Sequence, residues 1–280
     1  YGLFQLAGSI TIHQSADRVD ATLGNATYMA VYMLFHFFIT AFLFARWKGT
    51  VAVKYIYAVL MILQATMLYF TATRGAILGF VGGVALTGLL LLFLERKRPI
   101  VRKIGIGAVI AMILVVSSVY FAKDSDFVQE NTTLRRFANI SLEDSTVQSR
   151  FIIWNMAWQG VKEHPILGWG QENFNLVFNK YYDPRLYFAE PWFDRTHNIF
   201  FDWLIAGGLL GLLAYLSMPL LFLYYLWRAP PEIFSGTDKS ILTGLIAAYG
   251  VHNFFVFDNI VSYIMFFSLL AFRSEEHTSE

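Results

Sequence analysis

Long runs of apolar residues constrain this chain more than any other feature. Segment 75–94, for example, has no charged side chain, and its length is about the 20 residues that an α-helix needs to cross the hydrocarbon core of a bilayer. Over the whole chain 56% of the residues are hydrophobic and 15% are charged, whereas a soluble domain averages about 25% charged residues. The sequence therefore predicts an all-α, polytopic integral membrane protein.

Seven such runs are visible, and we predict about seven transmembrane helices from them. They cover residues 26–45, 52–72, 75–94, 104–121, 198–227, 241–257 and 259–272. The last run is shorter than a full span, so we expect it to be truncated. Residues 122–197 are polar, and we expect them to form a large extracytoplasmic loop region that contains an amphipathic helix.

These segments divide the chain into three parts and a tail. Residues 1–121 form the N-terminal part of the membrane bundle, 122–197 the loop region, and 198–272 the C-terminal spans. Residues 273–280 look like a non-native tail, and we exclude them from the predicted fold. Because the chain opens at Tyr1 inside a polar stretch, we expect a fragment that lacks N-terminal spans.

Positive charges are concentrated in the short loops that follow the first, third and fifth runs. Cytoplasmic loops of membrane proteins carry an excess of lysine and arginine, so these loops mark the predicted cytoplasmic side. The opposite face then receives the 8–25 segment, the turn at Arg74, the 122–197 region and Asp258. All the candidate chemistry collects on this outer face.

Composition also excludes several kinds of site. The chain has no cysteine, which excludes disulfides, thiolate metal sites and a cysteine nucleophile. Its formal net charge is +1 and it has no basic tract, so nothing indicates a nucleic-acid partner. It has no P-loop, G-x-S-x-G or H-E-x-x-H motif, so ATP hydrolysis, serine hydrolysis and zinc proteolysis have no support.

Two arginines lie where membrane insertion does not require them. Arg74 fills a turn of two or three residues between apolar spans, and burying it near the membrane is costly without an anionic partner. The competing interpretation is an arginine that snorkels to lipid phosphates. Arg150 lies in the first turn of a predicted helix, where the helix dipole disfavours a cation unless an anion binds nearby. There the competing interpretation is an ion pair with Glu143 or Asp144.

The helix that contains Arg150 is predicted to be amphipathic. Four residues recur at helical spacing, namely Phe151, Trp154, Trp158 and Val161. This stripe indicates a helix that lies on the membrane surface or against the bundle. We expect Ser145 or Thr146 as its N-cap and His164 as a structural residue at its C-terminal end.

His197 is the sharpest single signal in the sequence. It lies between a polar loop, which includes Arg195, and the apolar start of the fifth span. An imidazole at such an interface is suited to accept a proton from a hydroxyl group. The competing interpretation is a histidine that caps the span, with Asn198 satisfying backbone groups. We name Arg195, Asn198 and His252 as supporting residues, although a satisfied polar contact within the bundle is the simpler interpretation of His252.

Other polar and small residues in the spans have structural interpretations. His36 and Gln64 lie in the middle of spans and predict interhelical hydrogen bonds. Gly207, Gly208 and Gly211 form a face of small residues, which predicts close packing of the fifth span against another helix.

In their order and spacing, these segments resemble the O-antigen ligase and polymerase superfamily. The resemblance rests on Thr73-Arg74-Gly75-Ala76 at a span junction, Ser149-Arg150 with Trp154 and Trp158, His164-Pro165-x-x-Gly168-x-Gly170-x-x-x-Phe174, and His197-Asn198 before Gly207-Gly208-x-x-Gly211. It covers most of the chain, from about residue 15 to residue 272.

The resemblance implies a membrane glycosyltransferase that works without a metal or other cofactor and inverts the anomeric centre. Its donor would be a glycan linked to undecaprenyl diphosphate, and its acceptor a glycan or a lipid A-core type molecule. The family's catalytic histidine falls on His197, and its phosphate-binding arginines fall on Arg74 and Arg150, with Arg18 in the place of a further basic residue. The implied location is the bacterial inner membrane, among membrane lipids, with the active site facing the periplasm.

Other functions stay open at this point. A repeat-unit polymerase or a protein O-oligosaccharyltransferase would use the same donor and differ in the acceptor. A transporter or flippase of lipid-linked glycan would place ionisable residues in mid-membrane and broken helices in repeated halves. A structural scaffold would use the 122–197 region as an exported binding domain.

Overall fold

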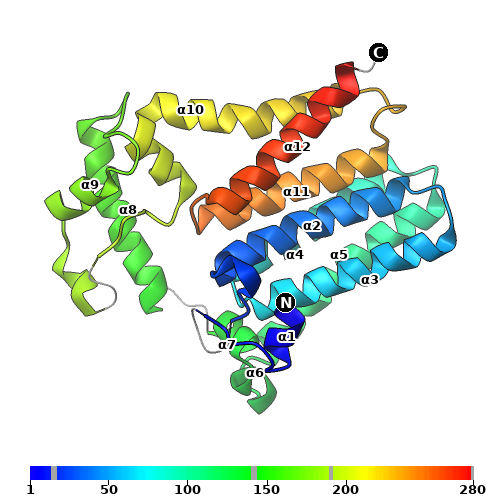
Figure 1. The fold of residues 1–280 in the computed structure, drawn as a ribbon, viewed down its shortest axis with the longest axis horizontal. Helices are drawn as coiled ribbons and strands as arrows, with labels where there is room; N and C mark the ends of the chain where they lie inside the picture. Colours follow the sequence, from blue (N-terminus) through cyan, green and yellow to red (C-terminus); the bar gives the residue numbers. More distant parts are fainter. Residues whose placement is uncertain (14–17, 140–143, 189–191, 279–280) are drawn as a thin grey trace. The chain divides into compact units, whose positions relative to one another are not determined.

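The computed structural model describes residues 1–13, 18–139, 144–188 and 192–278. Over these ranges the chain is all-α, with twelve α-helices, two short 3₁₀ helices and no strand (Figure 1). The chain divides into two compact units, and each is described by itself. Unit 1 comprises Tyr1–Ala138, Leu223–His252 and Asn259–Glu280, and unit 2 comprises Asn139–Phe222 and Asn253–Asp258.

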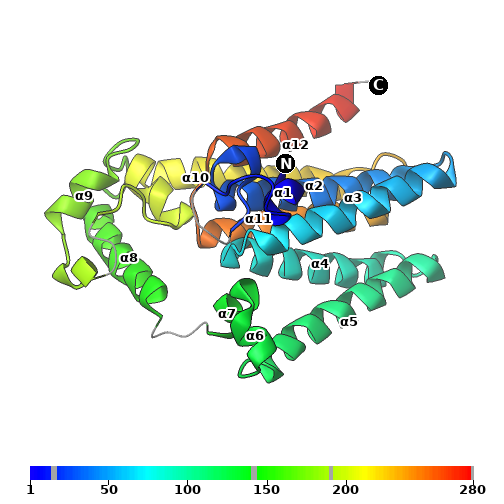
Figure 2. The same cartoon turned by 60° about the horizontal axis from the view of Figure 1, so that its bottom comes forward.

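Long helices joined by short turns form most of unit 1 (Figure 2). These are α2 (Ala26–Arg46), α3 (Val51–Phe70), α4 (Arg74–Leu94) and α5 (Pro99–Phe121). Together with α10 (Ile199–Arg228), they are the five helices of the described ranges that are long and apolar enough to cross a membrane. They correspond to the first five predicted spans.

The sixth and seventh predicted spans are not among these five helices, and the seventh is short, as predicted. α11 (Gly236–Phe254) covers most of the sixth, but its polar beginning, which includes Asp238, keeps it out of the set of five. The apolar part of α12 (Ile260–Thr278) is Ile260–Phe272, which is too short to span a bilayer alone. The helix itself continues to Thr278, beyond the end predicted at residue 272.

Glycines allow the helices of unit 1 to approach closely. A Cβ atom added to Gly83 of α4 would lie 2.6 Å from the carbonyl oxygen of Gly244 in α11, and one added to Gly244 would lie 2.7 Å from that of Gly83. Gly88 of α4 and Gly105 of α5 have the same relation, at 2.8 Å. Backbones that meet without intervening side chains gain the van der Waals contact that drives helix association in membranes.

One end of unit 1 carries the positively charged loops. Arg46, at the end of α2, forms an ion pair with Asp238 of α11 at 3.4 Å and donates a hydrogen bond to the carbonyl of Ile233. The hydroxyl of Thr237 donates to Glu95, which follows α4, at 2.8 Å. The loops that follow α2, α4 and α10 therefore lie at the same end, as their charges predict.

The opposite end of unit 1 holds segments predicted for the outer face. Its short helices are α1 (Gly2–Leu6), η1 (Ala21–Leu23), α6 (Asp126–Glu130) and α7 (Thr132–Ala138). Arg18 Nε donates to the carbonyl of Thr71, between α3 and α4, at 2.9 Å. The hydroxyl of Tyr69 donates to Asn131 at 2.7 Å. The described parts of the 8–25 segment, the turn before Arg74 and the start of the 122–197 region therefore share this end.

Unit 2 is organised around α8 (Ser145–Glu163), which packs with α9 (Phe174–Lys180), η2 (Pro184–Phe188) and the first part of α10. Small side chains form much of the buried face of α8, and a Cβ atom on Gly160 would lie only 2.5 Å from Val177 of α9. The predicted aromatic stripe is not this face, because Phe151 and Trp158 are 50% and 47% exposed. Small residues allow α8 to pack closely against α9, and the larger rings of Phe151 and Trp158 lie on the exposed side of the helix.

The N-cap of α8 is Asp144. Its carboxylate accepts a hydrogen bond from the backbone N–H of Thr146 at 2.9 Å. The prediction of Ser145 or Thr146 as the cap is therefore wrong, because a carboxylate just before the helix is the better acceptor for its first N–H groups. Arg150 consequently lies in the second turn of α8 and not in the first.

α10 is broken at Gly208, whose φ is +60° and ψ is −155°. The loop between α8 and α9 supplies the hydrogen bonds that the break removes. The N–H of Trp169 donates to the carbonyl of Ile205 at 2.6 Å, and the N–H of Leu209 donates to the carbonyl of Pro165 at 2.8 Å. The backbone groups at the break are therefore satisfied within unit 2, as buried backbone groups must be.

Two glycines make this contact possible. A Cβ atom on Gly168 would lie 2.6 Å from the backbone nitrogen of Gly208, and one on Gly208 would lie 2.7 Å from that of Gly168. The interpretation of Gly207, Gly208 and Gly211 as a helix-packing face is therefore wrong, since Gly208 breaks its helix and a Cβ on Gly207 would meet nothing within 4 Å.

The two mid-span polar residues behave differently. Gln64 of α3 donates to the hydroxyl of Thr40 in α2 at 3.0 Å, which confirms an interhelical hydrogen bond. The prediction of an interhelical hydrogen bond for His36 is wrong, because its Nδ1 lies 2.8 Å from the carbonyl of Tyr32 in the same helix. A carbonyl one turn earlier is always within reach of a helical side chain.

Candidate functional site

Arg150 and His197 line one pocket of unit 2. The pocket has a volume of about 270 Å³, and its wall consists of Ser145, Thr146, Ser149, Arg150, Ile153, Phe193 and His197. Hydroxyl groups, a guanidinium group and an imidazole ring thus surround one small cavity. The structure brings these two predicted site residues together, whereas Arg74 and Arg18 belong to unit 1.

His197 has a strained backbone and an oriented ring. Its φ is +55°, in the left-handed region that residues other than glycine rarely adopt. Its Nδ1 lies 3.2 Å from the carbonyl oxygen of Arg195. Because a carbonyl can only accept, this hydrogen bond places the proton of the neutral ring on Nδ1 and the lone pair on Nε2.

Two aromatic rings flank the imidazole of His197. The ring centroids of Phe193 and Phe257 lie 5.5 Å and 5.2 Å from it, both edge to face. The side chain is half-buried between them. This packing restricts the ring to one orientation, as an acid–base group needs.

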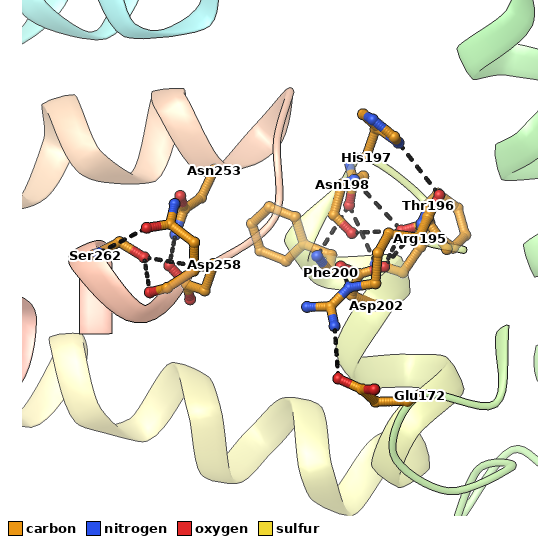
Figure 3. A network of polar contacts seen from close by, with 12 residues as sticks. Glu172, Arg195, Thr196, His197, Asn198, Phe200, Asp202, Asn253, Asp258 and Ser262 are labelled. Carbon is orange, nitrogen blue, oxygen red and sulfur yellow. Dashed lines mark hydrogen bonds and ion pairs between the residues drawn. The ribbon is translucent and has the colours of Figure 1, made fainter. Parts of the chain in front are cut away.

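Asn198 fixes the start of α10 directly after His197 (Figure 3). Its side-chain oxygen accepts hydrogen bonds from the N–H groups of Phe200 and Phe201, at 2.9 Å and 3.1 Å. Its amide group donates to the carbonyl of Phe254 at 3.0 Å. Asn198 therefore satisfies backbone groups, as the structural interpretation of this residue predicts.

Asp202, in the first turn of α10, fixes the other side of the turn (Figure 3). Its Oδ1 accepts hydrogen bonds from the N–H and the hydroxyl of Thr196, at 2.9 Å and 2.6 Å. Its Oδ2 accepts from Arg195 Nε at 3.2 Å. Sequence reasoning missed Asp202, although a carboxylate in the first turn of an apolar helix is a recognisable capping signal.

Arg195 has structural partners. Besides Asp202, its guanidinium group pairs with Glu172 at 3.8 Å (Figure 3). It also lies 5.0 Å from the centre of the Phe257 ring. In the described ranges it is not part of the pocket wall. Arg195 therefore helps to hold the turn that carries His197.

Trp154 connects α8 to the turn that carries His197. Its indole N–H donates to the carbonyl of Thr196 at 3.0 Å, and its ring stacks with Phe201 of α10. Trp154 lies one helical turn after Arg150, and Thr196 directly precedes His197. This hydrogen bond therefore holds the arginine and the imidazole at a fixed separation.

A buried polar network holds the segment that carries Phe257. Asp258 is 3% exposed and accepts hydrogen bonds from the hydroxyl of Tyr215 at 2.9 Å and from the amide of Asn253 at 3.0 Å. Figure 3 shows Asn253 and Asp258 side by side. Sequence reasoning placed Asp258 on the outer face but assigned it no role.

The two predicted site residues of unit 1, Arg18 and Arg74, lie at the turn between α3 and α4. Arg18 donates from Nη2 to the hydroxyl of Thr73 at 2.9 Å, in addition to its bond to Thr71. Arg74 begins α4 directly afterwards. Burial, and then the charge of Arg136, lower the pKa of Arg18 to about 10. The Arg18 guanidinium therefore stays charged at neutral pH.

The predictions for the two remaining histidines have different outcomes. His164 ends α8 as predicted, with its N–H 3.3 Å from the carbonyl of Gly160 and its ring packed edge-on against Trp169. His252 is fully buried in α11, and neither ring nitrogen has a hydrogen-bond partner among the residues that the structure describes. The interpretation of His252 as a satisfied polar contact is therefore wrong.

A larger cavity, of about 780 Å³, lies in unit 1 near its positively charged end. Phe44, Met61 and Ile104 are among its apolar lining residues, and Lys48 and Lys54 are among its basic ones. None of the predicted site residues belongs to its described lining. Size alone therefore does not identify the candidate site.

The fold and the site together define a class: an α-helical membrane protein whose small polar pocket contains an arginine and an oriented histidine. The family model described as O-antigen ligase matches residues 56–216, which is more than half of the chain. The chain belongs to the O-antigen ligase family. No curated protein matches it. The matched range includes Arg74, Arg150 and His197, and membership suggests glycan transfer of the ligase or polymerase type.

Proposed function

We propose that this protein transfers a glycan from an undecaprenyl-diphosphate-linked donor to a hydroxyl group of an acceptor. The proposed location is the outer face of the bacterial inner membrane, and the proposed acceptor is a glycan or a lipid A-core type molecule. One observation carries the proposal: Arg150 and His197 line the same pocket, where the carbonyl of Arg195 lies 3.2 Å from Nδ1 of His197 and orients the ring. A glycan transferase needs such a pairing of a phosphate-binding cation with a base.

His197 is proposed as the general base. Nε2 takes the proton of the acceptor hydroxyl while its oxygen attacks the anomeric carbon of the donor. The bond between that carbon and the phosphate oxygen breaks, and the electron pair leaves with undecaprenyl diphosphate. Attack opposite the leaving group inverts the anomeric centre.

Arginines are proposed to stabilise the leaving group. Charge grows on the phosphate oxygen as the glycosidic bond breaks, and a guanidinium group binds phosphate bidentately through its planar set of donors. Arg150 supplies such a group in the pocket of unit 2. Arg74 and Arg18 are proposed as further diphosphate-binding residues on the basis of the family resemblance alone. Because the donor is already activated, the proposal requires no nucleotide and no metal.

The test is a transfer assay with the purified full-length protein. Undecaprenyl-diphosphate-linked glycan and a nucleotide sugar are offered separately, with chelator present, and the products are separated and their anomeric configuration determined. The proposal expects transfer from the lipid-linked donor alone, release of undecaprenyl diphosphate and an inverted product. Transfer from the nucleotide sugar, a retained configuration or loss of activity in chelator would each contradict it.

A further inference from the structure

The large cavity of unit 1 is a groove among its long helices. Its apolar lining comes from α2, α3, α4 and α5, and it includes Phe37, Met61 and Ala108. α3 packs mainly against α2, and α5 packs mainly against α4. Ile104 of α5 lines the groove and is 58% exposed. The groove is therefore open on the side where a membrane-spanning α5 meets lipid.

The groove has a basic end and an apolar end. Lys54 and Met61 of α3 both line it and are seven residues apart, which is about 10 Å along a helix. Lys48 and Arg98, in the loops after α2 and α4, also line the basic end. The groove therefore begins among positive charges at the end of the spans and continues about two helical turns into their apolar part.

Lys54 has no anionic partner in the part of the chain that the structure describes. Its side chain is half-buried, and its Nζ lies 5.8 Å from the centre of the Phe44 ring in α2. Phe44 lines the groove as well, so the ammonium group is held beside an apolar wall. A half-buried cation near a membrane is unfavourable without a paired anion. The groove therefore suits a ligand that supplies one.

The other charges of the groove do not neutralise Lys54. The described lining has four cations and two acids, namely Arg46, Lys48, Lys54, Arg98, Glu232 and Asp238. Arg46 pairs with Asp238 at 3.4 Å. Arg98 pairs with Glu95 of its own loop at 3.6 Å. Glu232 is exposed and is a single carboxylate against the two lysines, so the basic end keeps an excess of positive charge.

We infer that this groove binds an anionic phospholipid from the leaflet at the positively charged end of unit 1. The lipid phosphate pairs with Lys54 and Lys48, and an acyl chain lies along the apolar wall toward Met61 and Ala108. Basic pockets between transmembrane helices bind anionic headgroups in this way. The site lies at the end of unit 1 opposite to Arg18, and the inference does not depend on the proposed transfer reaction.

Other occupants match the groove less well. A further apolar helix would fill it but would leave Lys54 without an anion. Free phosphate would pair with the lysines but would leave the apolar wall uncovered. A phospholipid satisfies both parts at once, and its phosphate lies at the depth where charged helix ends meet the bilayer surface.

The experiment measures lipid binding to the full-length protein by native mass spectrometry. The delipidated protein is titrated in detergent with phosphatidylglycerol and, separately, with phosphatidylethanolamine of the same acyl chains. We expect phosphatidylglycerol to bind at least about fivefold more tightly, because the basic end favours a net negative headgroup. Lys54→Ala should raise the dissociation constant of phosphatidylglycerol by about 5- to 50-fold.

Lys103→Ala is the matched control, since Lys103 is an exposed lysine of α5 outside the described lining of the groove. It should change the dissociation constant by less than about twofold. If Lys54→Ala does not fold, Lys54→Gln is held to the same criterion. Ala108→Trp leaves every charge in place and obstructs the apolar end, so it should also weaken the binding of phosphatidylglycerol, by about fivefold or more.

Three results would overturn the inference. The first is equal affinity for the two phospholipids, and the second is equal behaviour of the Lys54 and Lys103 variants. The third is unchanged binding in Ala108→Trp together with displacement of the lipid by inorganic phosphate, which would assign the lysines to a soluble anion. If another part of the full-length chain fills the groove, the protein will show no lipid binding that depends on Lys54, and the inference fails.

Discussion

At the scale of single residues, the backbone of His197 carries the main cost of building the site. A non-glycine residue at φ +55° costs on the order of 1–3 kcal/mol and persists when its surroundings determine it. Asn198 and Asp202 do this by binding the backbone on either side of the turn. The result is an imidazole that is oriented before any substrate arrives, which is what preorganised catalysis requires.

Arg150 offers the sharpest substitution at this scale. We expect Arg150→Ala to raise the donor KM by about 10- to 100-fold, because it removes charge-assisted hydrogen bonds to phosphate. Initial rates of transfer at varied donor concentration measure this. Arg185→Ala is the matched control, since Arg185 is an exposed arginine of unit 2 whose partner is Asp183. Equal KM values for both variants would contradict the assignment.

Which residues the sequence reveals depends on how local their signal is. His197 and Arg150 stand out because a polar residue beside an apolar run has few reasons to be there. Asp202 escaped notice, and Trp154 was noticed only as part of an aromatic stripe, because its hydrogen bond goes to a carbonyl 42 positions away. Such pairings follow from the fold and have no periodic pattern.

At the scale of elements, the contact between the broken α10 and the loop after α8 supports the site. The loop residues Pro165 and Trp169 bind backbone groups on both sides of the break at Gly208. Because α8 carries Arg150 and the start of α10 follows His197, this contact helps to fix the two elements that form the pocket. Broken helices in transporters free backbone groups for ions, whereas here the loop occupies them.

The variants Gly208→Ala and Gly207→Ala test whether the break in α10 depends on Gly208 in particular. The first puts a Cβ atom at a residue with φ +60° and 2.7 Å from the backbone nitrogen of Gly168, whereas the second meets nothing within 4 Å. Strain and overlap should destabilise Gly208→Ala by about 2–4 kcal/mol. Gly207→Ala should change stability by less than about 1 kcal/mol.

Thermal unfolding of the detergent-solubilised variants measures the difference. We expect a fall in Tm of several degrees for Gly208→Ala and a value close to the wild type for Gly207→Ala. Equal Tm values would show that the break does not depend on Gly208. The sequence predicted both glycines to be important, but a run of small residues does not say whether a helix or a loop approaches it.

At the scale of the whole molecule, the long apolar helices and their charged loops were the most predictable feature. Five of the seven expected spans are long apolar helices, and the loops after α2, α4 and α10 meet at one end of unit 1. Length and charge act locally, so the sequence shows them directly. α11 was overestimated because its middle is largely apolar while its first turn carries Asp238.

The absence of cysteine from this sequence allows a direct test of orientation. Lys48 and Asp124 are both exposed and follow α2 and α5 respectively. In intact cells, a membrane-impermeant maleimide should label Asp124→Cys and leave Lys48→Cys unlabelled until the membrane is opened. Labelling of Lys48→Cys alone would contradict the predicted orientation.

The central claim is that His197 removes the proton from the acceptor hydroxyl. The most direct measurement is the rate of glycan transfer by His197→Ala in the full-length protein at saturating lipid-linked donor, with His164→Ala as the matched histidine control. We predict that kcat falls by about 10²- to 10⁴-fold, the contribution of general base catalysis, while the donor KM changes by less than about threefold. A wild-type kcat for His197→Ala would contradict the account.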